Sequence, residues 1–301
     1  MTPQKTPFGG GNQFALNLIQ YLENHDILIT YKLEPDIDAI FIMDPRLLKF
    51  NKIDINQIKN FRLKYPNVKV VHRVNDCDKP RNQENVLDPI LQETFLINDL
   101  TIFVSEWTKN YFPQIPENSF VIHNGCNRNY FYPRFNKQLN PKIKLVTHHW
   151  SSNALKGKDI YQQLDDWIAD KNFEFIYIGR EFPGKAQNAK VIGPFFGLEL
   201  ANHLREADIY ISASQYENCP MHIIEGLSCG LPLIYHENIG GGCEIGKMHK
   251  QESFATFEEL ILKINLVVEK YNHYQKNIQF PLLSSNYSNQ KYYQLLMDHI
   301  T

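Results

Sequence analysis

Short apolar runs alternate with amphipathic stretches along the whole chain. The runs are rich in β-branched and aromatic residues, which is typical of strands, whereas the stretches between them repeat their apolar residues with a helical period. This alternation predicts βα units around mostly parallel sheets, and therefore an α/β fold. The expected strands cover residues 27–30, 39–43, 68–72, 101–105, 120–123, 143–147, 175–179, 208–212 and 233–235.

The expected helices lie between these strands. In the first of them, Phe14, Leu18 and Leu22 are spaced at i, i+4 and i+8, so they form one apolar stripe that should pack on a sheet. Further helices are expected over residues 197–206, over about 220–229, and at the C-terminus with a cap near Ser288. Glycines precede the first helix, yet MTPQKT does not resemble a strand. Either a first strand lies outside this sequence or irregular chain enters the glycine-rich turn.

The length of 301 residues favours two domains of roughly 150 residues each. The segment YPRFNKQLNPK, residues 132–142, interrupts the pattern with prolines and polar side chains, so we expect the domain boundary there. We expect one Rossmann-like domain over residues 1–135 and a second over residues 136–285. A C-terminal helix over residues 286–301 should return to the first domain.

The charges are balanced, with 31 basic and 33 acidic side chains and a formal net charge of −2. Such a chain has no overall positive field to hold a phosphate backbone, so we expect no nucleic-acid partner. Residues 44–73 are locally basic. They are typical of a solvated helix face, and the alternative is a contact with an anionic membrane surface or an acidic acceptor.

The five cysteines are an odd number and lack CxxC spacing, so neither a disulfide framework nor a zinc site is expected. The N-terminus lacks the apolar core of a signal peptide, and no apolar run reaches the roughly 18 to 20 residues that a membrane helix needs. These features predict a cytoplasmic protein, at most peripheral to the inner face of a membrane.

The most informative segment is DIYISASQYENCPMHIIEGLSCGLPLIYHENIGGGCEIG, residues 208–246. Its pattern predicts a strand, a loop, a helix, a second strand and a glycine-rich turn. Glu217 precedes the helix and Glu225 lies within it. In a helix this spacing separates the two backbones by about 12 Å and turns the side chains by roughly 80°. That separation suits a sugar diphosphonucleoside.

The start of that helix is a candidate phosphate site, because the first N–H groups of a helix lack partners and carry its positive dipole end. We expect Pro220 at the first helical position and the amides of Met221 and His222 as phosphate donors. Glu225 could accept from ribose hydroxyls and Glu217 from sugar hydroxyls. The alternative is that both glutamates only complement the helix dipole. However, Glu225 stands in an apolar helix, where an unpaired charge is costly, so it needs a partner.

Ser214, Glu217 and Glu225, followed by CGLP, resemble the signature of retaining glycosyltransferases of family four, which have the GT-B fold. Other segments resemble further family segments in the same order along residues 7–250. They are PFGGGNQF for the glycine-rich loop, VVHRVND for the central histidine segment, TIFVSEWTKNYF for a strand and helix of the first domain, VIHNGCNRNYFYP for the segment before the linker, and IGGGCEIG for the glycine turn beside the donor sugar.

The resemblance implies roles for individual residues. Glu225 would hold the ribose, Glu217 the transferred sugar, and the Met221 and His222 amides the diphosphate. Lys156, in LKGKD, would neutralise the phosphates and stabilise the leaving nucleotide.

In the first half, Gly10 and Gly11 would form the loop that approaches the donor phosphate. His72 would lie near the sugar and the acceptor, at the end of a strand. The alternatives are an ordinary surface lysine at position 156 and a structural histidine at position 72.

The chain departs from the family before Lys156, where a Gly-Arg pair would add a second phosphate cation. Here the strand ends in THHWSSNALKG, so His148, His149, a serine, or Arg180 from the next strand must replace it. Asn127 stands where the family has an aspartate. The loop NCPMHII between the glutamates is not glycine-rich, so donor identity does not carry over.

Taken together, the resemblance implies an α/β, GT-B fold with two facing Rossmann-like domains and an interdomain cleft. Residues 1–135 would serve the acceptor and residues 136–285 the donor. The expected reaction moves a sugar from a UDP- or GDP-sugar to a saccharide, lipid-linked or other hydroxyl acceptor, with retention of anomeric configuration. The nucleotide sugar is a co-substrate, and neither a metal ion nor another cofactor is expected.

Three alternatives remain open at this point. A GT-B-fold sugar-nucleotide epimerase would form product without an acceptor. A non-catalytic nucleotide-sugar binding subunit would bind the donor without turnover. A Rossmann oxidoreductase is a weaker alternative, because the glycines lack the GxGxxG spacing.

Overall fold

The chain folds into two compact units in this computed structural model, which describes residues 3, 9–47, 51–134, 137–151 and 153–300. Unit 1 comprises residues 1–124 and 285–301, and unit 2 comprises residues 125–284. The division at residue 124 lies ahead of the polar segment 132–142. Residues that follow residue 124 already bond within unit 2, since the Cys126 amide donates to the Leu283 carbonyl (2.8 Å) and Arg128 donates to the Phe280 carbonyl (3.0 Å).

Unit 1 is built on a four-stranded parallel sheet with the order β1-β2-β3-β4. Its strands are β1 (Ala39–Ile42), β2 (Lys69–Val74), β3 (Leu100–Phe103) and β4 (Ser119–Val121). Its helices are α1 (Gly9–Glu23), α2 (Ile55–Lys64), α3 (Asp88–Phe95), α4 (Glu106–Tyr111) and α11 (Ser285–Ile300), with a short 3-10 turn at Lys79–Arg81.

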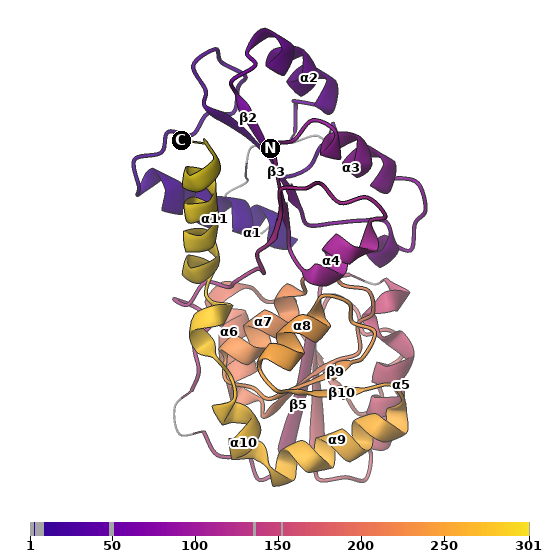
Figure 1. Ribbon diagram of the computed structural model, residues 1–301. Helices are drawn as coiled ribbons and strands as arrows, with labels where there is room; N and C mark the ends of the chain where they lie inside the picture. Colours follow the sequence, from indigo (N-terminus) through magenta and orange to yellow (C-terminus); the bar gives the residue numbers. More distant parts are fainter. Residues whose placement is uncertain (1–2, 4–8, 48–50, 135–136, 152, 301) are drawn as a thin grey trace. The chain divides into compact units, whose positions relative to one another are not determined.

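The first and last helices of the chain, α1 and α11, lie side by side on one face of this sheet (Figure 1). The predicted stripe is confirmed there, because Leu18 and Leu22 are buried against Val71 of β2 and Leu296 of α11. Ser288 does not cap α11, which begins earlier at Ser285, and the Ser288 hydroxyl donates to the His123 carbonyl instead (2.8 Å).

Helices α2, α3 and α4 cover the opposite face of the unit 1 sheet. Val70 of β2 packs with Ile58 of α2, and Val74 of β2 packs with Leu91 of α3 and Phe112. Alternate residues of β2 therefore serve two different layers, as expected for a strand with helices on both sides.

The prediction of a strand over residues 27–30 is wrong. Ile27 and Ile29 pack on the core under α1 and α11, whereas Leu28 is 97% exposed, so the alternation of a strand is present. The backbone, however, pairs with no strand, because β1 bonds only to β2 in the described sheet. Alternating burial alone does not make a strand when no neighbour supplies the hydrogen-bond ladder.

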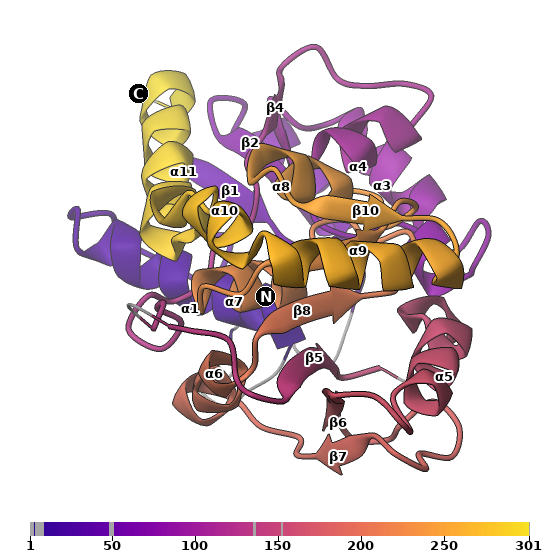
Figure 2. The same ribbon diagram turned by 90° about the horizontal axis from the view of Figure 1, so that it is seen from below.

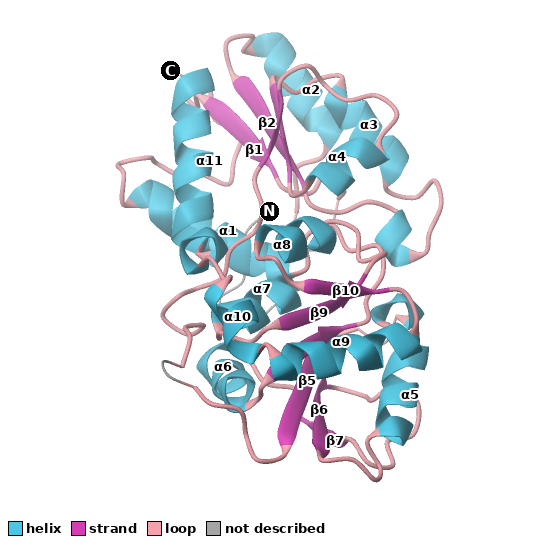
Figure 3. Cartoon of the chain, turned by 60° about the horizontal axis from the view of Figure 1, so that its bottom comes forward, coloured by secondary structure: helices cyan, strands magenta, loops and turns pink. Residues whose placement is uncertain are grey.

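Unit 2 is built on a six-stranded parallel sheet with the order β10-β9-β8-β5-β6-β7. Its strands are β5 (Ile143–His149), β6 (Phe173–Gly179), β7 (Lys190–Ile192), β8 (Ile209–Ser212), β9 (Leu233–His236) and β10 (Glu252–Phe254). Figure 3 shows the strands of each unit as a separate sheet. The edge strands β7 and β10, of three residues each, were not predicted.

The helices of unit 2 form two layers over its sheet. They are α5 (Lys158–Trp167), α6 (Gly197–Glu206), α7 (Met221–Ser228), α8 (Gly242–Met248), α9 (Phe257–Glu269) and α10 (Tyr271–Lys276), with 3-10 turns at Ala154–Lys156 and Phe280–Leu283. Leu164 of α5 and Leu260 of α9 pack on Leu145 of β5. Helix α7 packs on the other face, and α5 and α6 lie on either side of the sheet (Figure 2).

The strand order of unit 2 contains a switch point. The chain begins at β5, adds β6 and β7 on one side, and then crosses to β8 on the other side. In parallel α/β sheets, ligands bind at the carboxyl ends of the strands where the order reverses. A ligand-binding site is therefore expected at the loops after β5 and β8.

Candidate functional site

The loops that follow β5 and β8 pack directly against each other. The Gln215 amide donates to the Leu155 carbonyl (2.8 Å). A Cβ on Gly157 would lie 2.3 Å from the Cβ of Ala213, so only glycine allows this approach. Gly157 also has φ +90°, in the left-handed region that glycine adopts without strain. This contact brings the segment that carries Lys156 beside the segment that carries Glu217.

Lys156 and Glu217 form an ion pair in which the ammonium group donates to Oε1 of the carboxylate. Their side chains are 25% and 14% exposed, so the pair is partly shielded from water yet open to a ligand. The backbone of Glu217 is fixed on both sides, since its amide donates to the Ile239 carbonyl (2.9 Å) and its carbonyl accepts from the Gly241 amide (2.8 Å). The predicted glycine turn thus lies against Glu217.

Helix α7 begins one residue later than predicted. Pro220 is the N-cap with φ −69° and ψ 113°, and Met221 is the first helical residue. The proline ring presets φ alone, and the extended ψ leaves Pro220 outside the helix. No side chain caps α7, and in the described part of the chain the amides of Met221 and His222 make no hydrogen bond. These two amides are therefore free to donate to an anion.

Glu225 obtains its partner from the protein itself. Nε2 of His148 is 2.8 Å from Oε2 of Glu225, with the two side chains 4% and 19% exposed. On the other side of the ring, Nδ1 of His148 is 3.0 Å from the Tyr210 hydroxyl. The predicted need of Glu225 for a partner is met by β5, which the sequence did not indicate.

The adjacent histidines of β5 face opposite layers. His148 points toward α7, whereas Nε2 of His149 lies 2.7 Å from the Tyr161 hydroxyl of α5 and 3.1 Å from Oγ1 of Thr147. Burial, together with the charge of Lys156, lowers the pKa of His149 well below its usual value. A neutral imidazole supplies no positive charge, but it can still donate or accept a hydrogen bond.

The His222 side chain also has a local partner. Its Nε2 lies 2.8 Å from the Ser212 hydroxyl, and burial lowers the pKa of this imidazole well below its usual value. The neutral ring supports the start of α7, while the His222 amide remains available. The hydroxyl of Ser214, which is completely buried, has no partner among the residues that the structure describes.

Arg180 is the remaining candidate for the second phosphate cation. It follows β6 and is exposed, and within the described ranges it forms no ion pair or hydrogen bond. Its guanidinium lies 6.0 Å from the ring centre of Trp150, which stacks on Phe196 with the centres 4.0 Å apart. Arg180 therefore reaches the loop after β5, at the same end of the sheet as Lys156.

The candidates of unit 1 are placed differently. Gly10 and Gly11 form the first turn of α1 rather than a loop. A Cβ on Gly11 would lie 4.0 Å from the side-chain nitrogen Nδ2 of Asn75. The start of α1 is thus next to the residue that follows β2.

His72 lies inside β2 rather than at its end, and it is completely buried beside Phe95 of α3. Neither of its ring nitrogens has a partner in the described part of unit 1. Burial lowers the pKa of His72 to about 3, which keeps the ring neutral. The role of His72 near the sugar and the acceptor stays a prediction.

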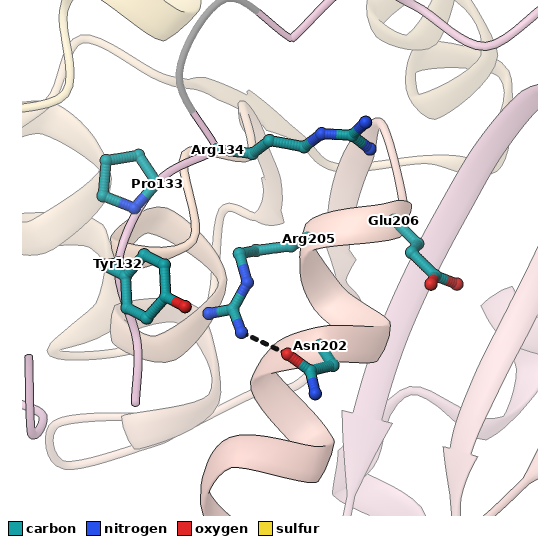
Figure 4. A pocket seen from close by; sticks show the side chains of 6 residues that line it. All are labelled: Tyr132, Pro133, Arg134, Asn202, Arg205 and Glu206. Atoms are coloured by element: carbon teal, nitrogen blue, oxygen red, sulfur yellow. Dashed lines mark hydrogen bonds between the residues drawn. The ribbon is translucent and has the colours of Figure 1, made fainter. Parts of the chain in front are cut away.

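A hollow of about 480 Å³ lies at the other end of the unit 2 sheet (Figure 4). It lies beside the last turn of α6, which leads into the amino end of β8. Arg205 donates to the carbonyl of Tyr130 (2.7 Å) and to Asn202, and its guanidinium lies over the Tyr132 ring. These donors serve the structure, so the hollow is not the site. Its lining residues are Tyr132, Pro133, Arg134, Asn202, Arg205 and Glu206.

The sequence and fold of the chain are similar to those of known glycosyltransferases. Residues 184–280 match the family of glycosyl transferases group 1. A probable sucrose-phosphate synthase of Thermosipho melanesiensis is 32% identical over 186 residues, which are 53% of this chain and 42% of that protein. The match thus spans less than half the length of this relative.

Two solved structures share the fold over nearly the whole chain. The sucrose-phosphate synthase of Thermosynechococcus elongatus covers 96% of this chain and 93% of its own, with a TM-score of 0.68 and 14% identity. Anabaena Alr3699/HepE, in complex with UDP-glucose, covers 99% of this chain and 98% of its own, with a TM-score of 0.72 and 15% identity.

The parallel sheets of the two units and these structural matches define a GT-B-type α/β protein with two Rossmann-like units. The predicted fold class is confirmed at this level. More specifically, the residues that match the group 1 glycosyl transferase family, 184–280, lie within unit 2. In the described part of the chain, no helix combines the length and the apolar character needed to cross a membrane.

Proposed function

We propose that this chain is a glycosyltransferase of the hexosyltransferase type, which moves a sugar from a nucleotide-diphosphate donor to a hydroxyl acceptor with retention of anomeric configuration. The observation that carries the proposal is the pairing of Lys156 with Glu217 directly before the uncapped start of α7, at the switch point of the unit 2 sheet. A cation, free amides and carboxylates at one end of a parallel sheet suit a sugar nucleotide.

Each group has a part in the proposed reaction. The Met221 and His222 amides and Lys156 would hold the diphosphate and stabilise the negative charge that develops as the glycosidic bond breaks. Arg180 would add the second cation. Glu217, released from Lys156 by the incoming phosphates, would accept hydrogen bonds from the sugar hydroxyls. Catalysis would rest on positioning and charge stabilisation.

The relatives support a nucleotide-sugar donor. The structural matches include Anabaena Alr3699/HepE in complex with UDP and with UDP-glucose. UDP-sugars are therefore the first donors to test, with GDP-sugars next. A saccharide or lipid-linked acceptor, a cytoplasmic location and a peripheral membrane contact stay predictions from the sequence. Lys59 and Arg62, in the basic stretch, already pair with Glu93 and Asp99 inside unit 1, which weakens the case for a membrane contact.

The direct test is a thermal-shift screen with UDP, GDP, ADP and NAD, followed by release of nucleotide from the matching sugar donors with and without acceptors. We expect stabilisation by UDP or GDP and turnover that EDTA leaves unchanged. A rise in melting temperature with NAD and with none of the other nucleotides would contradict the proposal. Product formed without any acceptor would favour an epimerase, and binding without turnover a non-catalytic subunit.

Two variants separate the roles of the glutamates. Glu225→Ala should abolish donor binding, because the ribose loses its carboxylate partner, whereas Glu217→Ala should mainly reduce turnover. The control is Glu269→Ala, an exposed position at the end of α9. Isothermal titration with UDP and steady-state kinetics measure both effects. Equal donor affinity in the wild type and Glu225→Ala would show that the ribose assignment is wrong.

A further inference from the structure

We infer that His148 is a positioning residue that holds the Glu225 carboxylate in the orientation needed to bind the ribose of the donor. The inference rests on the proposed function and adds to it a residue whose contribution comes through Glu225. Three elements of unit 2 meet at this point, namely β5 with His148, β8 with Tyr210 and α7 with Glu225.

The hydrogen bonds fix the ring and its proton. An ionised carboxylate can only accept, so Nε2 of His148 carries the hydrogen that points at Oε2 of Glu225 (2.8 Å). Nδ1 then accepts from the Tyr210 hydroxyl (3.0 Å), whose oxygen accepts in turn from the His148 backbone amide (3.1 Å). Burial keeps the pKa of Tyr210 well above its usual value, so this hydroxyl remains a donor.

The arrangement leaves one oxygen of Glu225 for a ligand. Oε2 is bound by His148, whereas Oε1 makes no hydrogen bond within the part of the chain that the structure describes. His148 is 3% exposed and Tyr210 is completely buried, so the support is rigid and dry. The Glu225 side chain is 19% exposed. A buried support with a half-open carboxylate is typical of a preorganised binding group rather than of a surface ion pair.

The residue after Glu225 makes the contact possible. A Cβ on Gly226 would lie 2.5 Å from Cδ2 of Tyr210, so any larger residue would push α7 away from β8. Glycine lets α7 approach the sheet closely enough for Glu225 to meet His148. Tyr210 thus fixes the ring of His148 and also sets how closely α7 approaches β8.

The test compares His148→Leu with His148→Gln, using UDP and inorganic diphosphate as probes in titration calorimetry. Leucine removes the donor to Glu225, and glutamine keeps an N–H near the place of Nε2. We expect His148→Leu to weaken UDP binding by roughly tenfold, the effect of one lost hydrogen bond to a charged group. His148→Gln should stay within about threefold of the wild type. Inorganic diphosphate, which lacks ribose, should bind all three proteins within about twofold.

A double-mutant cycle separates positioning from a general structural effect. In a Glu225→Gln chain, His148→Leu should cause little further loss of UDP affinity, because the two residues act as one unit. Three results would each overturn the inference. They are a further loss of roughly tenfold in UDP affinity when His148→Leu is added to Glu225→Gln, equal losses of affinity for UDP and diphosphate in His148→Leu, and unchanged UDP affinity in His148→Leu. A wild type that binds neither UDP nor GDP would instead overturn the proposed function, so the two failures are distinguishable.

Discussion

His72 and His148 are both buried histidines in parallel strands, one in each unit, yet their surroundings are opposite. His72 of β2 has no partner for either nitrogen in the described residues, and burial lowers its pKa despite the opposing charge of Asp44. His148 of β5 is bonded through both nitrogens, to Glu225 and to Tyr210. Burial alone therefore does not indicate function. The partners of a buried polar group tell a packed core from a built site.

The largest effect that we expect concerns His72 and pH. Its pKa is lowered from 6.5 to about 3 in the folded chain, so the unfolded chain binds the proton more readily. The contribution of His72 to the stability of unit 1 should thus be fully present above about pH 6.5. It should be lost as the pH falls toward 3, by an amount on the order of 5 kcal/mol. His72→Leu should remove this part of the acid sensitivity. Hydrogen exchange of peptides from β2 between pH 7 and 4 measures it.

The control for this experiment is His273→Leu, an exposed histidine in α10, which should keep the pH profile of the wild type. At neutral pH, His72→Leu should be close to the wild type in stability, because no hydrogen bond of the imidazole is lost. Identical pH profiles for His72→Leu and the wild type would show that His72 does not carry the effect.

The next effect concerns the charges of unit 2. Lys156→Met should lower turnover about 100- to 1000-fold, as expected when a group that stabilises the departing charge is removed from an active site. The fold should persist, because Lys156 is partly exposed and its only ion pair among the described residues is with Glu217. Lys276→Met, at an exposed position in α10, is the matched control. Turnover of Lys156→Met within twofold of the wild type would contradict the assignment.

A smaller effect is expected from Gly226→Ala. The added methyl group must displace the Tyr210 ring or α7, which costs roughly 1 to 3 kcal/mol of stability. The displacement should also separate Glu225 from His148, so UDP affinity should fall more than affinity for inorganic diphosphate. Thermal unfolding and titration calorimetry measure the two changes. An unchanged melting temperature together with unchanged UDP affinity would show that α7 tolerates the shift.

Periodicity was sufficient to predict the alternation of strands and helices and the buried stripe of α1, because each is a pattern of residues close together in sequence. It failed at residues 27–30, where the burial pattern of a strand is present without a pairing partner. Glu225 could be recognised as a charge that needs a partner, but not matched with His148. That contact joins residues 77 positions apart and depends on how β5, β8 and α7 pack.

The predicted site residues also divide into those whose placement follows from the order of the strands and those whose placement depends on packing. Glu217, Lys156 and the start of α7 meet because loops after neighbouring parallel strands share one end of the sheet. The sequence showed that the family arginine is missing and offered His148, His149, a serine and Arg180 in its place, but it could not tell the two adjacent histidines apart. The structure separates them by the layer that each one faces.

The two adjacent histidines of β5 also make this strand intolerant of insertion or deletion. Moving β5 by one position would turn the ring that now meets Tyr161 toward α7, and would send the ring that now meets Glu225 into the layer under α5. Glu225 of α7 would then no longer meet the imidazole of His148. Evolution can therefore lengthen the loop after β5 far more easily than it can lengthen the strand.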